Sequence, residues 1–137
     1  MQLSNYLFFT TMCEQALNFY TDCGLGKVTT LVRYGDNAMP VPEEAFRGKI
    51  MHSRFEGPGV SFYASDNPDA EPMRGSAHIL MMDDRESTDR LFHRLAEGGV
   101  VTTALGMQPW GDYYGKLTDR FGVQWMLNFP IRSRDAN

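Results

Sequence analysis

The chain has 137 residues, with 13 lysines and arginines against 17 aspartates and glutamates and a formal net charge of −4. That length suits one domain or two small halves, and 42% hydrophobic residues argue against a disordered chain. The acidic balance, without a basic cluster, argues against nucleic-acid and anionic-membrane partners. No apolar run approaches the ~20 residues of a membrane helix, and a signal-peptide pattern is missing. We expect a cytoplasmic protein whose two cysteines, Cys13 and Cys23, are reduced and buried.

The first half of the chain predicts a strand, a helix and three more strands. Residues 2–9 are aromatic-rich and β-prone. The spacing of Thr11 and Glu14 is typical of a capping box, which predicts a helix start there, and Gly24 and Gly26 predict its end. The remaining segments of this half are strands at 27–34, 49–56 and 59–65 and a loop at 35–48.

The second half repeats this order after a polar, proline-containing linker. We expect a strand at 76–82, then a helix capped by Asp83 or Asp84 and ended by Gly98-Gly99. Three strands follow, at 100–104, 114–118 and 123–129, with a loop at 105–113. The predicted organisation is module one at 1–66, the linker at 67–75, module two at 76–130 and a C-terminal tail at 131–137.

Several short motifs in this order resemble one known family. They are Asn5-Tyr-Leu-Phe-Phe9, Leu17-Asn-Phe-Tyr20, Met51-His52, Leu95-Ala-Glu-Gly-Gly99, Trp110-Gly111 and Asp119-Arg-Phe-Gly-Val-Gln-Trp125. Together they are similar to the PhnB-like branch of the vicinal oxygen chelate superfamily, which includes glyoxalase I, bleomycin-resistance proteins and extradiol dioxygenases. The resemblance implies an α+β fold of two βαβββ modules paired around a cleft, and a homodimer.

In the metalloenzymes of this superfamily, the first and fourth strands of each module carry the metal ligands. The matching positions here are Asn5, Phe62, His78 or its neighbour Ala77, and Met126. Only His78 is a good donor, whereas a stable zinc or nickel site needs three or four protein ligands. We therefore expect no bound metal and no cofactor.

Some PhnB-like sequences carry the name 3-demethylubiquinone methyltransferase, which implies S-adenosylmethionine. A glycine loop that binds such a cofactor joins a strand to a helix start. Gly24 and Gly26 follow a helix end instead. The residues do not favour methyl transfer.

Strand alternation divides the predicted strands into two faces. If Asn5 and His78 face the cleft, then Tyr6, Phe8, Ile79 and Met81 pack beneath the helices. The predicted ligand-binding residues of this mostly apolar cleft are Asn5, Phe9, Phe62, His78, Trp110, Tyr114 and Met126.

Two sets of polar residues are candidates for chemistry. His52, Arg54 and Glu56 share one strand face, where Arg54 suits an anion clamp and His52 an acid or base. The alternative is a charged edge on which Arg54 pairs with Glu56. His78 is either a polar group of the cleft or a core histidine.

Trp110, Tyr113 and Tyr114 suit an aromatic lid over a planar ligand, or else a plug of the module or a buried dimer contact. Three functions stay open. The first is a metal-free small-molecule binder. The second is a lyase or isomerase, with or without a divalent metal, that uses His78, His52 and Arg54. The third is a dimeric structural or regulatory module.

Overall fold

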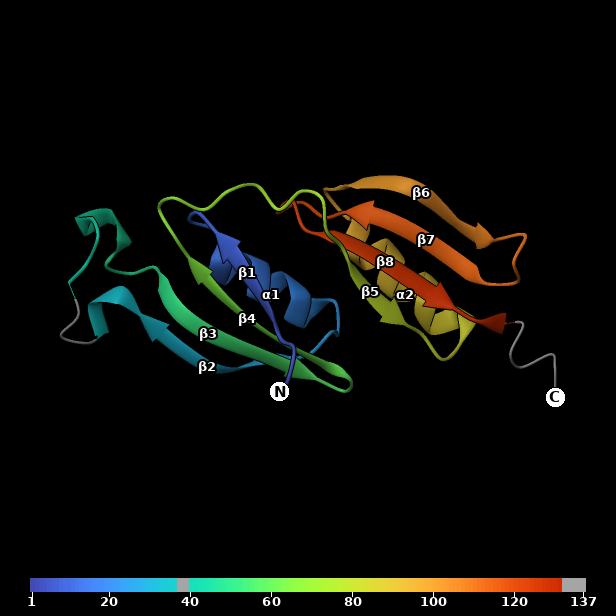
Figure 1. Cartoon of the computed structure of the whole chain (residues 1–137), viewed down its shortest axis with the longest axis horizontal. Helices are drawn as coiled ribbons and strands as arrows, with labels where there is room; N and C mark the ends of the chain where they lie inside the picture. The colour runs from blue at the N-terminus through green and yellow to red at the C-terminus, as the bar shows by residue number, and fades with distance from the viewer. Residues whose placement is uncertain (37–39, 132–137) are drawn as a thin grey trace. The chain divides into compact units, whose positions relative to one another are not determined.

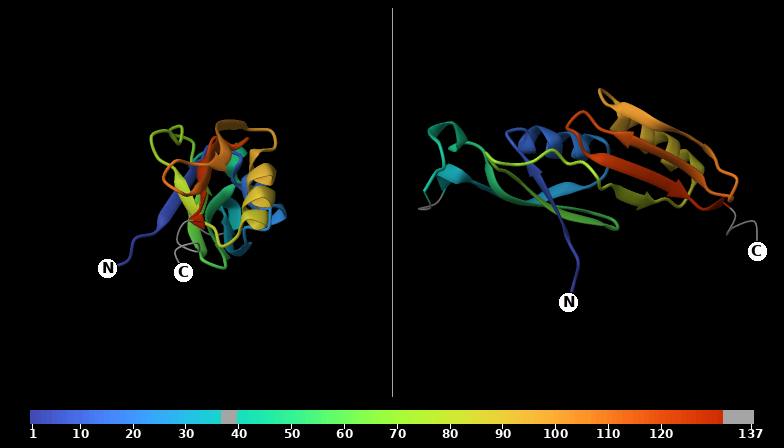
Figure 2. Two further views of the ribbon diagram at one scale, coloured as in Figure 1. Left: turned by 90° about the vertical axis from the view of Figure 1, so that its right-hand side faces the viewer. Right: turned by 45° about the horizontal axis from the view of Figure 1, so that its top comes forward.

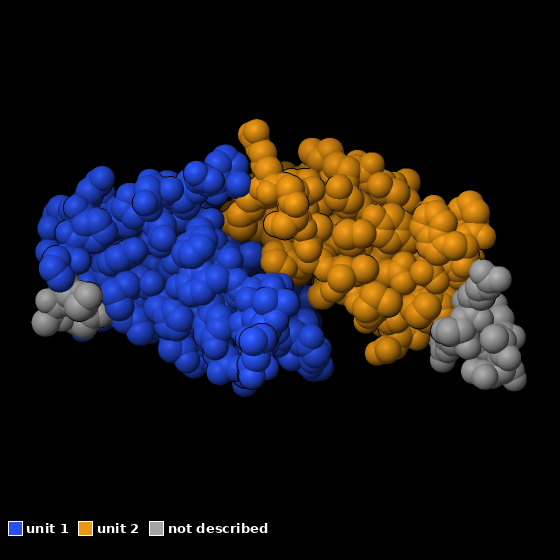
Figure 3. All heavy atoms as spheres, in the orientation of Figure 1, with its two compact units in different colours: residues 1–72 blue, residues 73–137 orange. Residues whose placement is uncertain are grey.

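The computed structural model describes residues 1–36 and 40–131 of the chain. The chain divides into two compact units, Met1–Pro72 and Met73–Asn137, here called unit 1 and unit 2 (Figure 3). The division falls inside the predicted linker at 67–75. The predicted tail lies outside the described residues except for Ile131, and part of the predicted loop at 35–48 lies outside them as well.

Unit 1 is one four-stranded sheet with one α-helix (Figure 1). The sheet order is β1-β4-β3-β2, with β1 parallel to β4 and the other pairs antiparallel. The elements are β1 (Asn5–Phe9), α1 (Cys13–Asp22), β2 (Lys27–Arg33), β3 (Ile50–Gly57) and β4 (Val60–Asp66), with short 3₁₀ turns η1 (Tyr34–Asp36) and η2 (Glu44–Phe46).

Unit 2 repeats this topology with the sheet order β5-β8-β7-β6. The elements are β5 (His78–Met81), α2 (Arg85–Ala96), β6 (Val100–Met107), β7 (Tyr113–Thr118) and β8 (Gln124–Phe129). The predicted α+β class and the βαβββ order of both halves are confirmed. The predicted loop at 105–113 is shorter than expected, because β6 continues to Met107 against β7.

In each unit the helix covers one face of the sheet (Figure 2). The apolar stripe of α1, which consists of Cys13, Ala16, Leu17 and Tyr20, is buried. The Tyr20 ring meets Phe55 and Phe62 edge-on at centroid distances of 6.4 and 6.2 Å. In unit 2, a Cβ atom on Gly115 would lie 2.7 Å from the Phe92 ring of α2. A glycine at this point of β7 lets α2 approach the sheet closely.

The two faces of β1 and β5 are the reverse of those predicted. Leu7 and Phe9 are buried on the α1 face, whereas Tyr6 is 38% and Phe8 45% exposed on the other side. Likewise His78 pairs with Trp125 on the α2 face, while Ile79 and Met81 are 52% and 60% exposed. The helix-free side of each sheet is called its open face below.

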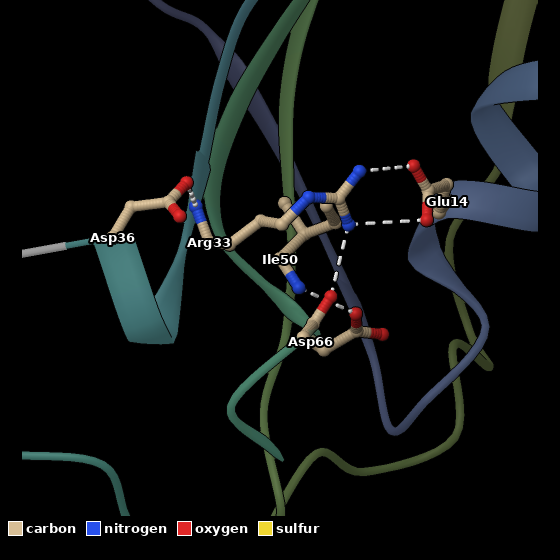
Figure 4. A network of polar contacts seen from close by, with 6 residues as sticks. Glu14, Arg33, Asp36, Ile50 and Asp66 are labelled. Atoms are coloured by element: carbon tan, nitrogen blue, oxygen red, sulfur yellow. Dashed lines mark hydrogen bonds and ion pairs between the residues drawn. The ribbon is translucent and has the colours of Figure 1, made fainter.

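The start of α1 differs from the predicted capping box. Met12 is the N-cap residue and no side chain of the first turn caps the helix. Instead the buried Asp66 carboxylate, at the end of β4, accepts hydrogen bonds from Cys13 N (2.9 Å) and Ile50 N (3.0 Å), the latter drawn in Figure 4. The cap comes from 53 residues away, so one carboxylate joins α1, β3 and β4. The α2 start matches the prediction, since Asp84 accepts from Ser87 N (2.7 Å).

A second polar contact links β2 to α1. Arg33 donates to both carboxylate oxygens of Glu14, at 3.1 and 2.6 Å (Figure 4). It also donates to the carbonyl oxygen of Gly48 at 2.9 Å. Both side chains are partly exposed, so solvent screens this pair and it adds little stability compared with the buried Asp66 bonds.

Both cysteines are free and buried, as predicted. Burial, together with the Asp66 charge, raises the pKa of the Cys13 thiol to about 12. The longest described helix has 12 residues, and none of the described helices is long and apolar enough to span a membrane.

We predict that Asp66→Ala lowers the free energy of unfolding by about 2–4 kcal/mol, because two buried amide groups lose a charged acceptor. Urea unfolding followed by circular dichroism measures the change. Asp66→Asn, which keeps one carbonyl acceptor, should fall between wild type and Asp66→Ala. Asp69→Ala, at an exposed site three residues on, is the matched control. If Asp66→Ala lowers the free energy of unfolding no more than the control does, the proposed stabilising role of the Asp66 hydrogen bonds is wrong.

Candidate functional site

The open face of unit 1 carries a continuous group of rings, here called the aromatic face: Tyr6, Phe8, His52 and Tyr63. Tyr6 stacks on Phe8 and on Tyr63, with centroid distances of 4.8 and 5.9 Å and interplanar angles of 25° and 20°. His52 stacks on Tyr63 at 5.6 Å and 26°. The group arises because β1, β3 and β4 are neighbours in the sheet and place these residues on its helix-free side.

Polar atoms border the aromatic face. The Tyr6 hydroxyl and His52 Nδ1 form a hydrogen bond of 3.2 Å. The Arg54 guanidinium lies over the Tyr63 ring, 5.7 Å from its centroid, and Arg54 Nε pairs with Glu56 Oε1 at 2.6 Å. The pairing expected in the alternative interpretation of Arg54 is therefore present. Stacked rings beside a cation and an imidazole suit a planar ligand with an anionic or hydrogen-bonding group.

The open face of unit 2 has residues at positions equivalent to those of the aromatic face, but their side chains differ in chemistry. Register relates the two sheets: Tyr6 pairs with Tyr63 on one, and Ile79 with Met126 on the other. Arg54 lies opposite Tyr63, and Lys116 lies opposite Met126. This face is aliphatic where unit 1 is aromatic, and a cation is present at the equivalent place in both.

Three of the predicted ligand-binding residues lie on the α1 side of unit 1. Phe9 and Phe62 are 4% and 5% exposed, and Phe62 stacks on Phe55 within the core. Asn5 pairs with Phe62 and is two residues before Leu7, so its side chain lies on the same face of the sheet as Leu7. Sequence reasoning instead missed Tyr6, Phe8 and Tyr63 as members of an open-face group. Their aromatic character was the available signal, but it is equally typical of a core.

His78 also lies on a helix-covered face, in unit 2. Its ring is 5.3 Å from the Trp125 ring, and the Trp125 indole Nε1 donates to the buried Asp119 carboxylate at 2.9 Å. Burial lowers the pKa of His78, partly offset by the Asp119 charge. The predicted grouping of His78 with Met126 is not found, because adjacent residues of β8 point to opposite faces and His78 pairs with Trp125.

The predicted aromatic lid is divided among three environments. Trp110 is exposed in the turn between β6 and β7. Tyr113 is buried on the α2 side, where its hydroxyl donates to Asp89 and the Arg85 guanidinium lies 4.5 Å from its ring centroid. Tyr114 has the opposite parity and lies on the open face of unit 2.

The residues at the superfamily's metal-ligand positions do not fit a divalent metal ion. With the faces corrected, the open-face pairs nearest the superfamily's ligand positions are Tyr6 with Tyr63 and Ile79 with Met126. A divalent ion that prefers imidazole and carboxylate ligands finds neither among these four. Within residues 1–36 and 40–131, no group of three or more His, Cys, Asp or Glu side chains has the geometry to hold a metal ion.

A cofactor loop for S-adenosylmethionine does not fit either. The two strand-to-helix turns are Thr10-Thr-Met12 and Met82-Asp-Asp84, and neither contains glycine. Gly24, at φ +85°, instead follows α1, where its amide donates to Thr21 O at 3.0 Å. Gly24 therefore ends a helix and does not cradle a nucleotide.

Two successive βαβββ units, together with the family match and the PhnB-like structure described next, identify the class, a protein of the vicinal oxygen chelate superfamily. A model of the family described as "3-demethylubiquinone-9 3-methyltransferase" matches residues 1–128, and the chain belongs to this PhnB-like family.

Solved structures agree with the assignment. Protein PA1353 from Pseudomonas aeruginosa is 36% identical with a TM-score of 0.84, covering 94% of this chain and 97% of that one. A putative 3-demethylubiquinone-9 3-methyltransferase, PhnB protein, from Bacillus cereus is 27% identical with a TM-score of 0.76, covering 94% and 99%. A glyoxylase/bleomycin resistance protein/dioxygenase domain from Frankia sp. EAN1pec (14% identity, TM-score 0.66, covering 95% and 92%) shares the fold.

We predict that the free energy of unfolding falls as pH drops from 7.5 to 5.5, and falls less in His78→Gln. The pKa of His78 is lowered in the folded chain, so its neutral form contributes stability above the unfolded value of ~6.5, and this contribution is lost as pH falls below that value. Urea titrations across this range measure the slope. His93→Gln, on the exposed side of α2, is the control, and an unchanged slope in His78→Gln would contradict the prediction.

We also predict that chelator-stripped protein gains no saturable thermal stability from Mn²⁺, Fe²⁺, Ni²⁺, Zn²⁺ or Mg²⁺. A specifically bound ion at a free concentration one hundred times its dissociation constant would raise the free energy of unfolding by about 2.7 kcal/mol. This raises the melting midpoint by several degrees. A saturable shift with one metal, abolished by His52→Gln, would contradict the argument from the donor set.

Proposed function

We propose that the protein binds a small planar organic molecule on the aromatic face of unit 1, without a metal or cofactor. The observation that carries the proposal is the stacked arrangement of Tyr6, Phe8, His52 and Tyr63 on the helix-free side of the sheet. Side chains this large are normally placed in a core, and exposing them together favours a binding surface.

Arg54 supports a ligand with an anionic group. Its guanidinium lies beside the rings, and its ion pair with Glu56 is partly exposed, so a ligand anion can compete with Glu56 at a small energetic cost. A planar aromatic carboxylate fits both the rings and the cation.

An enzyme of the lyase or isomerase type is the second candidate. It is favoured by one contact, the hydrogen bond between the Tyr6 hydroxyl and His52 Nδ1, because a coupled phenol and imidazole suit proton transfer. His52 and Arg54 remain the proposed acid–base and anion-binding groups in that case. His78, on the α2 face, is proposed only for a structural role.

A cytoplasmic homodimer belongs to the same proposal. Two free, buried thiols suit a reducing compartment. Val100, Val101 and Met107 on the edge strand β6 are exposed apolar side chains of the kind that a second copy would cover. The resemblance to the superfamily supports the dimer.

We predict that 2-naphthoate binds better than 2-naphthol, and that Tyr63→Ala weakens 2-naphthoate about tenfold through loss of the stacked ring. Titrations followed by amide chemical shifts measure both affinities. Phe19→Ala, an aromatic residue on the helix side, is the matched control. Arg54→Gln should remove the preference for the carboxylate.

Equal binding of 2-naphthoate to Tyr63→Ala and to wild type would overturn the proposal. Tyr6→Phe separates the two candidates: it keeps the ring and removes the hydroxyl, so a pure binder loses little affinity, whereas an enzyme loses turnover.

A further inference from the structure

Lys116, on the open face of unit 2, is a cation that pairs with no carboxylate in the part of the chain that the structure describes. It lies on β7, an inner strand, between Met126 of β8 and Thr103 of β6. Its side chain is half-buried, and among the described residues it forms no ion pair. Lysine is disfavoured at inner strand positions, where a long charged side chain gains little from packing.

Comparison with unit 1 shows what is missing. Arg54 holds the equivalent position there and is neutralised by Glu56, two residues further along the same strand. The residue two positions after Lys116 is Thr118, which is uncharged. Unit 2 therefore has a cation at the position equivalent to Arg54 but no carboxylate at the position equivalent to Glu56.

Lys116 has polar and apolar neighbours on this face: Tyr114 and Thr118 flank it along β7, and Met126 lies opposite it on β8. Ile79 and Met81 are 52% and 60% exposed on the edge strand β5, and Met126 lies between them and Lys116. At the start of β7, the Asp112 carboxylate accepts from Asn128 Nδ2 at 3.2 Å and makes no ion pair with Lys116. The face thus presents an aliphatic strip of Met126, Ile79 and Met81 beside Lys116, which forms no ion pair among the described residues.

We propose that the open face of unit 2 binds an amphipathic carboxylate, a small molecule with an aliphatic body and one anionic head group. The head group pairs with the Lys116 ammonium, and the body lies across Met126 toward Ile79 and Met81. Charge complementarity selects this occupant over a neutral apolar molecule, because only an anion supplies the counter-charge that Glu56 supplies in unit 1.

This site is argued from unit 2 alone and does not rest on the aromatic-ligand proposal. The test titrates octanoate and 1-octanol at pH 7.5 into the full chain, followed by amide chemical shifts. We expect octanoate to perturb the amides of β5, β7 and β8 with saturation. Lys116→Met should weaken octanoate about tenfold, equivalent to about 1.4 kcal/mol, and leave 1-octanol unchanged. Lys116→Arg should restore the binding.

Two controls make the result specific. Lys27→Met removes an exposed lysine from the edge strand β2 and should leave octanoate binding unchanged. Tyr63→Ala should do so as well, so failure of the aromatic site and failure of this site are distinguishable. Equal octanoate affinity in Lys116→Met and wild type, 1-octanol binding as well as octanoate, or a face covered by a second copy that excludes octanoate would each overturn the proposal.

Discussion

One helix per sheet is the constraint on which the rest of this structure depends. A four-stranded sheet has two faces, and α1 or α2 covers only one of them in each unit. Because side chains alternate along a strand, the parity of a residue decides whether it is buried or available to a ligand. A shift of one residue in the pairing of β1 with β4 would exchange Tyr6 and Leu7 and remove the aromatic face. Register, more than composition, therefore selects the residues that are able to meet a ligand.

The order of elements and much of the core were predictable from the sequence, since α1, α2 and β8 have clear periodicity. The faces of β1 and β5 were not. Residues 6–9 are all large and apolar or aromatic, and residues 78–81 contain a single polar residue. The sequence therefore has no polar–apolar alternation that would show which side chains face the helix. The parity comes from pairing with β4 and β8, which a single sequence does not reveal. The cap of α1 was hidden for a related reason: its acceptor, Asp66, is 53 residues away from Cys13.

The two units show how one scaffold carries different chemistry at matching positions. Along β3 and β7 the cation is kept at Arg54 and Lys116, while the carboxylate at 56 corresponds to a threonine at 118. On the first strands, aromatic Tyr6 corresponds to aliphatic Ile79. None of these changes affects the helix-covered face, where Phe55, Phe62 and Trp125 form the cores. Core packing and open-face chemistry therefore vary separately in this fold.

That separation also divides the polar groups by their role. Asp66 and Asp119 are buried, and each carboxylate is satisfied by backbone amides or an indole, so changing either one leaves donors unpaired and costs stability. His78 is packed on the same side as Trp125 and shares this structural environment. Arg54 and Lys116 lie on faces that no helix covers, and their loss leaves no buried group unsatisfied. The groups that stabilise the fold and the proposed ligand-binding groups thus lie on opposite faces of the same strands. Substitutions on the open faces are therefore the ones that we expect to test the proposed functions without unfolding the chain.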